Sequence, residues 1–423
     1  MVKNTLGTIN TMHRTLSPNS IGIWRNNKIH TRVKSNYMPR FFTNTSSFCK
    51  FEKGVFENAP NISYHLTGYG ILKNESLIRF LGESAERFTF TCINKVIKSR
   101  IVEDSIEGLK NKAEKSTVVP LEYIKIYEGM DINEHSKIFW VKMNSFNARY
   151  DYVYIPAAFV IMGWELLKSE SITKNIKSVS TGTACHQTVK KALESSIVEY
   201  LQLDSANLWW QSGIKGRDIP DKEVNKILEK IDLDKEFSNK FYVKVTDISF
   251  DKPIYVYTCE IFSKDENLPK YAIGIQGGMD SEEAIYRGIM EALTILEYVY
   301  NYKFINEKAY DKVTLNSREF YDLDSNVVFY SKYGKEHMEN DVEIQWNNEK
   351  YYTTKELFKF VSKEYEFAGF LDITIDDFSH IGFNTTRVII PELLPLYLPS
   401  LIPVNHPRFK QYEVKNYAPH PMP

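Results

Sequence analysis

The sequence lacks a cysteine pattern, a long apolar run and an excess of charge of either sign. Its four cysteines are scattered, and none has CxxC or zinc-ligand spacing. No apolar run approaches the length of about 20 residues that crosses a bilayer. Lys and Arg number 53 and Asp and Glu 54, so the net charge of −1 attracts neither nucleic acid nor an anionic membrane. These absences favour a reduced cytoplasmic protein with no nucleic-acid or membrane partner.

Acidic residues are missing from the first 51 positions, which carry several Lys and Arg residues. Such a start has features of a transit peptide, but the same Asn, Lys, Ile and Tyr bias continues through the whole chain. We interpret residues 1–59 as a basic N-terminal segment. Two alternatives stay open for it: a loosely ordered arm, or a source of cations that line a phosphate or acidic-peptide site.

Three segments share one pattern, a loop of small residues followed by a polar helix start and a glutamate two turns into the helix. They are residues 68–88, 180–205 and 274–296. When they are aligned without gaps, the glutamates that coincide are Glu83, Glu199 and Glu291. One such glutamate indicates only a solvated helix face, because glutamate is a good helix former. Three in matched register indicate carboxylates that converge.

Converging carboxylates cannot all be buried without counter-charges, because desolvating them costs too much. Cations between them are therefore expected. Hard oxygen ligands favour Mg²⁺, which proteins usually hold with few carboxylates and the phosphates of a substrate. The pattern thus points to a nucleotide.

At these residues the chain resembles the YcaO family of ATP-dependent peptide-modifying enzymes. GESAER at 82–87 is similar to the family's GExxER signature. STGTACH at 180–186, followed by Glu199, Gln202 and Asp204, is similar to its STGxAxH loop and E-x-x-[EQ]-x-D helix. The stretch 371–396 and the final PHPMP resemble the azoline-forming cyclodehydratase branch, the streptolysin- and microcin-type D subunit that ends in Pro-x-Pro-x-Pro.

The resemblance implies an α/β fold over residues 60–423, with three related strand–loop–helix units around a central nucleotide site and mixed sheets. An antiparallel hairpin expected over 241–262 also favours mixed sheets over purely parallel ones. Residues 305–365 are crowded with charge and tyrosine, and we expect a solvated insertion there. Residues 419–423 form the proline-rich tail.

The resemblance also implies roles for individual residues, with ATP and Mg²⁺ as cofactors. The implied magnesium ligands are Glu83, Glu86, Glu199 and Gln202. The implied nucleotide contacts are Arg87, Ser180, Thr181, Gly182, Arg287 and Glu291. Arg87 is also a candidate catalytic residue, as is Pro423, whose free carboxylate is a conceivable general base for the attack on the peptide. Cys185 and His186 are expected to serve loop packing, and Trp209 and Trp210 the core.

The activity implied is ATP-dependent cyclodehydration of Cys, Ser or Thr in a ribosomally made precursor peptide, which gives thiazoline or oxazoline rings. Phosphorylation of the backbone amide oxygen makes that oxygen a leaving group. Little chain precedes the GExxER helix, so an E1-like subunit is expected to bind the leader peptide. A flavin dehydrogenase that oxidises the rings is a further expected partner, and homodimerisation is usual in the family.

Two alternatives remain: a YcaO enzyme that makes thioamides or amidines, and a catalytically weak scaffold subunit. The Pro-x-Pro-x-Pro ending argues against the first. Departures from the usual family pattern bear on the second. They are Tyr69 in place of a lysine between two glycines, Arg79 in place of a small residue, Gln202 in place of a glutamate and Thr294 in place of a glutamine.

Overall fold

The computed structural model describes residues 13, 16, 23–31, 40–48, 65–112, 115–161, 178–233, 235–317, 320, 323–336, 338 and 340–422. Within these residues the strands form three sheets. Most of the predicted basic segment lies outside this description. Its described part is built into the fold, since two of its stretches are strands that bury Trp24 and Phe48, and Phe41, just before the second strand, is also buried.

The first sheet is antiparallel and joins the chain start to the first of the three repeated segments. It consists of β1 (Trp24–Thr31), β2 (Phe42–Phe48) and β3 (His65–Gly70). Helix α2 (Lys73–Thr91) packs on it and buries Phe80 and Leu81. The indole Nε1 of Trp24 donates to the hydroxyl of Ser84 over 2.9 Å, which ties β1 to α2.

The second sheet has strand order β5-β7-β6-β13-β14-β8, with β4 paired to β6. Its strands are β4 (Ile101–Asp104), β5 (Ser116–Val118), β6 (Ile138–Ser145), β7 (Tyr152–Pro156), β8 (Thr183–His186), β13 (Gly369–Asp372) and β14 (Asn384–Ile389). The β5–β7 pair is parallel and the other pairs are antiparallel, so the sheet is mixed. The short helices that accompany it are α3 (Ile93–Val96), η2 (Lys98–Arg100), α4 (Ile106–Lys112), η3 (Leu121–Tyr123), α5 (Ala157–Val160) and α13 (Asp376–Ser379).

The third sheet is antiparallel and carries the last repeated segment. Its order is β12-β11-β10-β9, from β12 (Tyr271–Gly278), β11 (Tyr255–Ser263), β10 (Phe241–Asp247) and β9 (Arg217–Asp218). The predicted hairpin is therefore present as β10 and β11. The helices of this lobe are α7 (Asp221–Lys230), α8 (Lys235–Lys240), α9 (Ser281–Ile305) and α10 (Glu307–Lys312).

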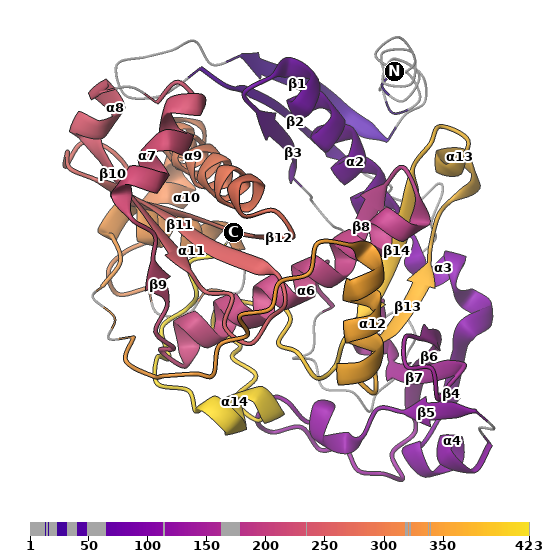
Figure 1. Ribbon diagram of the computed structural model, residues 1–423. Helices are drawn as coiled ribbons and strands as arrows, with labels where there is room; N and C mark the ends of the chain where they lie inside the picture. The colour runs from indigo at the N-terminus through magenta and orange to yellow at the C-terminus, as the bar shows by residue number, and fades with distance from the viewer. Residues whose placement is uncertain are drawn as a thin grey trace.

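Helix α6 (Val189–Gln211) runs through the middle of the molecule (Figure 1). It contacts β8 and β14 of the second sheet and β11 and β12 of the third. Nearly every residue from Tyr200 to Gln211 is buried, including Trp209 and Trp210, as a helix between two lobes requires. Its first turn is capped by Thr188, whose side chain accepts from the backbone N–H of Lys191.

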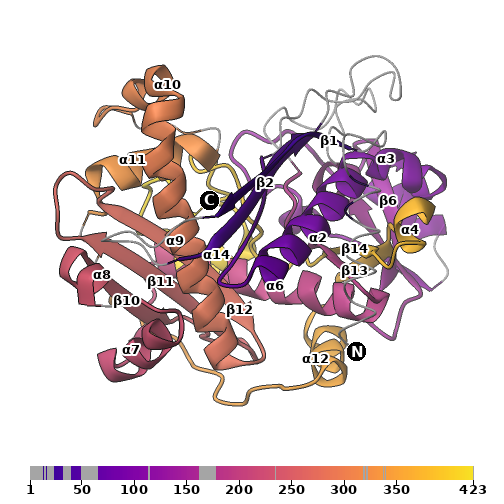
Figure 2. The ribbon, with the colours of Figure 1, turned by 90° about the horizontal axis from the view of Figure 1, so that it is seen from above.

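The three repeated segments form a closed ring of strand–helix pairs. Within the described residues β3, β8 and β12 are each the edge strand of a sheet, and α2, α6 and α9 follow them in sequence. Each helix packs on its own strand and also on the next one: α2 contacts β8, α6 contacts β12 and α9 contacts β3. Seen from above, the first sheet lies between α9 and α2 (Figure 2). The predicted α/β fold with three related units and mixed sheets is confirmed.

One local expectation is wrong. The segment 305–365 is not solvated throughout, since α11 (Leu323–Tyr333) buries Asn326 and Val328 and α12 (Thr354–Glu364) buries Leu357. The last helix, α14 (Pro407–Tyr412), begins with proline at its first position, where the missing N–H costs nothing.

In the part of the chain that the structure describes, no helix is long and apolar enough to cross a membrane.

Two glycines test the close strand–helix packing on which the first unit depends. A Cβ on Gly68 of β3 would lie 2.2 Å from the backbone oxygen of Ser76, whereas one on Gly82 of α2 would meet nothing within 4 Å. We expect Gly68→Ala to lower the free energy of unfolding by about 1–3 kcal/mol. The control Gly82→Ala is expected to raise it by up to about 1 kcal/mol, because alanine favours helix. Urea denaturation measures both, and equal effects would contradict the packing described.

Candidate active site

Each repeated glutamate is fixed by the same backbone contact. A carboxylate oxygen on the helix accepts a hydrogen bond from a backbone N–H at the edge strand of its own unit. The three pairs are Thr67 N to Glu83 Oε2, Gly182 N to Glu199 Oε2 and Ile275 N to Glu291 Oε2, each 2.9 Å long. An edge strand leaves alternate N–H groups without a strand partner, and here a carboxylate satisfies one of them. The glutamates are therefore held against the sheets and do not extend into bulk water.

Glutamates of the first two units share one electrostatic cluster around Arg87. The Arg87 Nε atom lies 3.8 Å from Glu83 Oε1, and its Nη1 atom lies 3.5 Å from Glu86 Oε1. Burial raises the pKa of Glu86 to about 8, and the carboxylates of Glu199 and Glu83 add to the rise while Arg87 opposes it. Burial also raises the pKa of Glu83 and of Glu199, again against Arg87. The structure thus brings three of the four implied magnesium ligands, Glu83, Glu86 and Glu199, next to Arg87.

The third unit faces the first across Tyr69. Burial raises the pKa of Glu291 to about 7, opposed by hydrogen bonds from Gln276 and Ile275 and by Arg287 and Arg79. The pKa of the Tyr69 hydroxyl is raised by burial and by the carboxylates of Glu291 and Glu83. Tyr69 therefore lies between the glutamates of two units, and Arg287 belongs to the same electrostatic group.

Two departures from the family pattern are neighbours in space. The guanidinium of Arg79 lies 5.3 Å from the centre of the Tyr69 ring, and it pairs with Glu75 at 2.8 Å. Tyr286 orients Glu75 by donating to its carboxylate over 3.0 Å. Tyr69 cannot supply a positive charge at position 69. The neighbouring Arg79 supplies one, so the site keeps a cation beside Tyr69.

The side-chain amide of Gln202 joins the second unit to the third. Its Nε2 donates to the carbonyl of Ile275 over 2.6 Å, and its Oε1 accepts from the N–H of Gly277 over 2.8 Å. Both halves of the amide are therefore engaged by the backbone of β12. A carboxylate could accept from Gly277 but could not donate to Ile275, so the amide suits this joint between the second and third units.

The Ser180–Gly182 loop is held rigidly before β8. Gly182 has φ +81°, and a Cβ there would lie 2.1 Å from the Val388 carbonyl oxygen, so only glycine fits. The hydroxyl of Thr181 accepts from Leu396 N and is buried, while Ser180 is half-buried. Of these three residues, Ser180 is the one with a side chain left at the surface of the loop.

Arg387 on β14 is a functional candidate that sequence reasoning missed. It is 1% exposed, and its guanidinium donates to the carbonyls of Phe159, Val179 and Thr181. It thereby fixes the loop that carries Gly182, and its charge helps to stabilise the Glu199 carboxylate. The available signal was a single arginine directly before the apolar residues Val388, Ile389 and Ile390, since a buried arginine needs partners.

Asp204, the last residue of the α6 motif, lies on the opposite face of the helix from Gln202. It is fully buried and pairs with Lys252 at 2.7 Å and Arg408 at 2.6 Å. Burial works to raise its pKa, but Arg408 and Lys252 outweigh this and hold it below its ordinary value. Asp204 therefore joins α6 to the β10–β11 connection and to α14.

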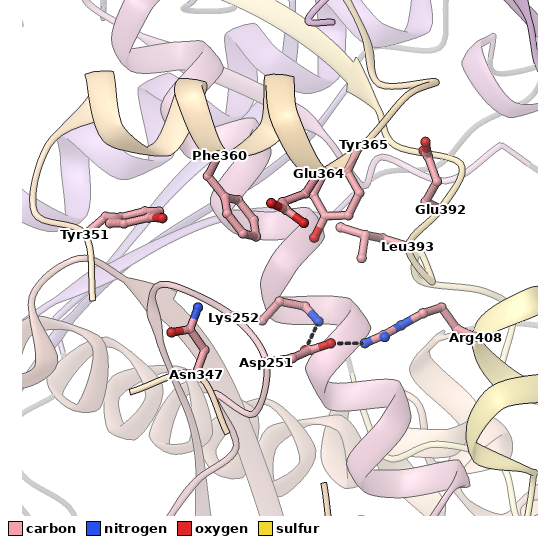
Figure 3. Close-up of a pocket in the computed structure, with 10 residues that line it drawn as sticks. All are labelled: Asp251, Lys252, Asn347, Tyr351, Phe360, Glu364, Tyr365, Glu392, Leu393 and Arg408. Carbon is pink, nitrogen blue, oxygen red and sulfur yellow. Dashed lines mark hydrogen bonds and ion pairs between the residues drawn. The ribbon is translucent and has the colours of Figure 1, made fainter. Parts of the chain in front are cut away.

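A cavity of about 410 Å³ lies on this opposite side of α6, and Figure 3 shows its lining. Phe360 and Glu364 of α12 face Asp251, Lys252 and Arg408 across it. The two cations are already paired, since both contact Asp251 and Asp204. The cavity is thus a seam between packed elements, separate from the glutamate cluster.

The proline-rich tail is part of the interior as far as Met422. His420 is fully buried and Met422 is 3% exposed. Pro423, the candidate general base, lies outside the described residues. The tail is therefore not a frayed terminus over its described length.

A family model for a YcaO cyclodehydratase, ATP- and Mg²⁺-binding, matches residues 67–394. The chain belongs to the YcaO family. The matched span contains all three glutamate units and most of the second and third sheets. No match was found among curated proteins.

Solved YcaO-type structures share the fold at low sequence identity. A heterocyclase in complex with substrate and cofactor matches with a TM-score of 0.64 and 15% identity, over 99% of this chain. This chain spans only 57% of that heterocyclase's length. The E. coli microcin synthetase McbBCD complex with pro-MccB17 bound matches with a TM-score of 0.61 and 14% identity, over 94% of this chain and 96% of that one. YcaO from Methanopyrus kandleri, bound with AMPPCP and Mg²⁺, matches with a TM-score of 0.56 and 14% identity, over 93% and 91%.

The prediction of ATP and Mg²⁺ as cofactors is confirmed, since the family binds both. The residues present fit this chemistry. Among the described residues no three Asp, Glu, His or Cys side chains enclose a metal ion by themselves. Mg²⁺ does not require such a cage, because one or two carboxylates plus substrate phosphates usually hold it. The Glu199 carboxylate raises the pKa of Glu86, so a cation beside the two would be favoured, and Arg87 and Arg287 add positive charge suited to phosphate.

The raised pKa of Glu86 predicts a pH dependence of stability in the absence of nucleotide and metal. Its ordinary value is 4.5 and its value in the folded chain about 8, so the folded state holds the proton more tightly. The stabilisation from that proton is complete below about pH 4.5 and is lost as the pH rises to about 8. Relative to Glu86→Gln, we expect the wild-type free energy of unfolding to fall by up to about 1 kcal/mol per pH unit in this window. Urea denaturation at several pH values measures the difference, and a constant difference would contradict the burial of this carboxyl.

Proposed function

We propose that this YcaO protein is the catalytic subunit of an ATP- and Mg²⁺-dependent cyclodehydratase that forms thiazoline or oxazoline rings from Cys, Ser or Thr of a ribosomally made precursor peptide. The observation that carries the proposal is the set of three glutamates tied to edge strands around one centre. Further support is the half-buried group of Glu83, Glu86 and Glu199, in which the other two carboxylates raise the pKa of Glu86. Such a group is stabilised by bound cations.

Within this proposal Glu83, Glu86 and Glu199 hold Mg²⁺, and Glu291 completes the site from the third unit. The backbone N–H bonds fix one oxygen of each carboxylate before any ligand arrives. Gln202 acts indirectly, because it holds β12 and therefore Glu291 at the correct distance from α6. Preorganisation of this kind is the main contribution of a protein to phosphoryl transfer.

Arg87 and Arg287 bind the phosphate groups in this scheme, and Ser180 with the Gly182 loop approaches the nucleotide. Bound ATP supplies the phosphoryl group that makes the amide oxygen of the peptide a leaving group. The thiol or hydroxyl of the peptide adds to the preceding carbonyl carbon, and that oxygen then departs with the phosphoryl group. Arg87 stabilises the negative charge that develops on the transferred phosphoryl group. Its guanidinium is already positioned by the two carboxylates on either side of it.

The partners belong to the same proposal: a precursor peptide, an E1-like leader-binding subunit, a flavin dehydrogenase and a second copy of the chain, in the cytoplasm. The microcin synthetase that shares the fold is a complex with pro-MccB17 bound, which supports a peptide substrate and partner subunits. The ordered tail supports the azoline-forming branch over thioamide or amidine formation.

Replacing Glu83 with glutamine tests the proposed function. We expect peptide-dependent phosphate release, measured with precursor peptide and partner subunit, to fall by about 100-fold or more, because a charged cation ligand is lost. The variant should remain folded, since the amide oxygen can still accept from Thr67. Glu194→Gln is the matched control: it changes a glutamate on α6 that pairs with Lys191 at 2.7 Å, away from the cluster.

The outcomes separate the rival functions. Unchanged phosphate release in Glu83→Gln would remove Glu83 from the site. If the wild-type protein neither binds ATP–Mg²⁺ nor releases phosphate, it is a scaffold subunit. If it releases phosphate but the peptide shows no loss of mass equal to water, the reaction is not ring formation.

A further inference from the structure

The buried end of the chain can accept hydrogen bonds but has few N–H groups with which to donate them. Prolines at 419 and 421 remove two N–H groups and favour an extended backbone. Every carbonyl of a buried segment still needs a donor, because an unsatisfied one is costly. Another element must therefore supply side-chain donors.

The end of α6 supplies the first donors. The indole Nε1 of Trp210 and the side-chain Nε2 of Gln211 both donate to the carbonyl of Ala418, over 3.0 and 3.1 Å. Asn416 continues the contact, because its backbone N–H donates to the Gln211 carbonyl over 2.9 Å. The tail therefore begins where the central helix ends.

Helix α11 supplies the remaining donors. The hydroxyl of Tyr330 donates to the carbonyl of Pro419. The side-chain Nδ2 of Asn326 donates to two carbonyls, that of His420 over 2.7 Å and that of Met422 over 2.9 Å. Asn326 is fully buried. One primary amide carries two hydrogens, so asparagine can serve both carbonyls, whereas aspartate or leucine can serve neither.

The His420 side chain adds a contact on the other side of the tail. Its Nε2 lies 2.8 Å from the Tyr397 carbonyl, and the two rings meet edge to face at 5.2 Å. Burial lowers the pKa of His420 to about 4, so the ring is neutral and Nε2 carries the proton that it donates. The tail is thus held from α6, from α11 and from the segment after β14.

We propose that α11 is the docking surface for the chain's own proline-rich end, and that Asn326 is the positioning residue that fixes its last residues. Nothing in the sequence motifs singles out Asn326 or Tyr330, because both lie in the segment that was expected to be solvated. Docking itself does not depend on the proposed function. Its consequence for activity does, since a fixed tail matters to ring formation only if the protein forms rings.

Hydrogen exchange of the full-length protein, followed by mass spectrometry of its C-terminal peptide, tests the docking directly. We expect Asn326→Leu to speed exchange in residues 413–423 by about tenfold or more, because two carbonyls lose their donor. Asn340→Leu is the matched control, since Asn340 also donates to two carbonyls, those of Trp209 and Ile214, but does not touch the tail. Unchanged exchange in Asn326→Leu, or equal effects of the two variants, would overturn the proposal.

If Asn326→Leu does not fold, two milder variants of α11 provide the same test. Tyr330→Phe removes the donor to Pro419, whereas Tyr333→Phe removes a hydroxyl of the same helix that donates to Val313 over 3.2 Å. Only Tyr330→Phe should loosen the C-terminal peptide. Equal exchange in both variants would contradict docking on α11.

An activity measurement then separates the two proposals. With precursor peptide and partner, Asn326→Leu should lower ring formation by about tenfold or more while ATP–Mg²⁺ affinity stays within about twofold, because α11 does not carry the glutamate cluster. If the wild-type protein forms no ring, the proposed function fails, and the exchange result still decides whether Asn326 fixes the tail. If exchange responds but ring formation does not, Asn326 is not a positioning residue for the reaction.

Discussion

The architecture depends on a hydrogen bond between a helix glutamate and a backbone N–H at the edge of a sheet, made three times. Each bond satisfies an edge-strand donor that would otherwise need water, and each holds a carboxylate where burial is costly to it. Every helix also packs on the strand of the next unit. The costly groups of neighbouring units therefore interact, Glu199 with Glu86 of the first unit and Glu291 with Tyr69 of the first unit. Burial of the carboxylates therefore destabilises the folded protein, and a nucleotide-bound cation would remove this cost. Folding stability and ligand binding are thus coupled through the same carboxylates.

The side chains that depart from the family pattern make specific contacts in the folded structure. Tyr69 and Arg79 stack, so that the cation missing from one position is present at its neighbour. Gln202 gives up the charge of a glutamate and gains a donor for the backbone of β12. These pairings lower the support for a scaffold that has lost its site, because three of the four departures, Tyr69, Arg79 and Gln202, make contacts that preserve the site.

The sequence predicted what repeats within it and missed what depends on distant contacts. The glutamate register, the hairpin of β10 and β11 and the buried tryptophans follow from local spacing and residue type. The role of Arg387 could not be predicted, because its partners lie more than 200 residues away in the chain. Helix α11 was misjudged for the same reason: its charges and tyrosines suggest a solvated segment, but its buried face is covered by β12, by α9 and by the returning chain end.

Diffraction from crystals grown with AMPPCP and Mn²⁺ in place of Mg²⁺ is the most direct test of the central claim, because the anomalous signal locates the ion without reference to activity. The account predicts a peak between α2 and α6, coordinated by Glu83, Glu86 and Glu199 with nucleotide phosphate, and Arg87 beside it. A nucleotide bound without any such peak, or a peak confined to the cavity beside Asp251 and Arg408, would contradict it.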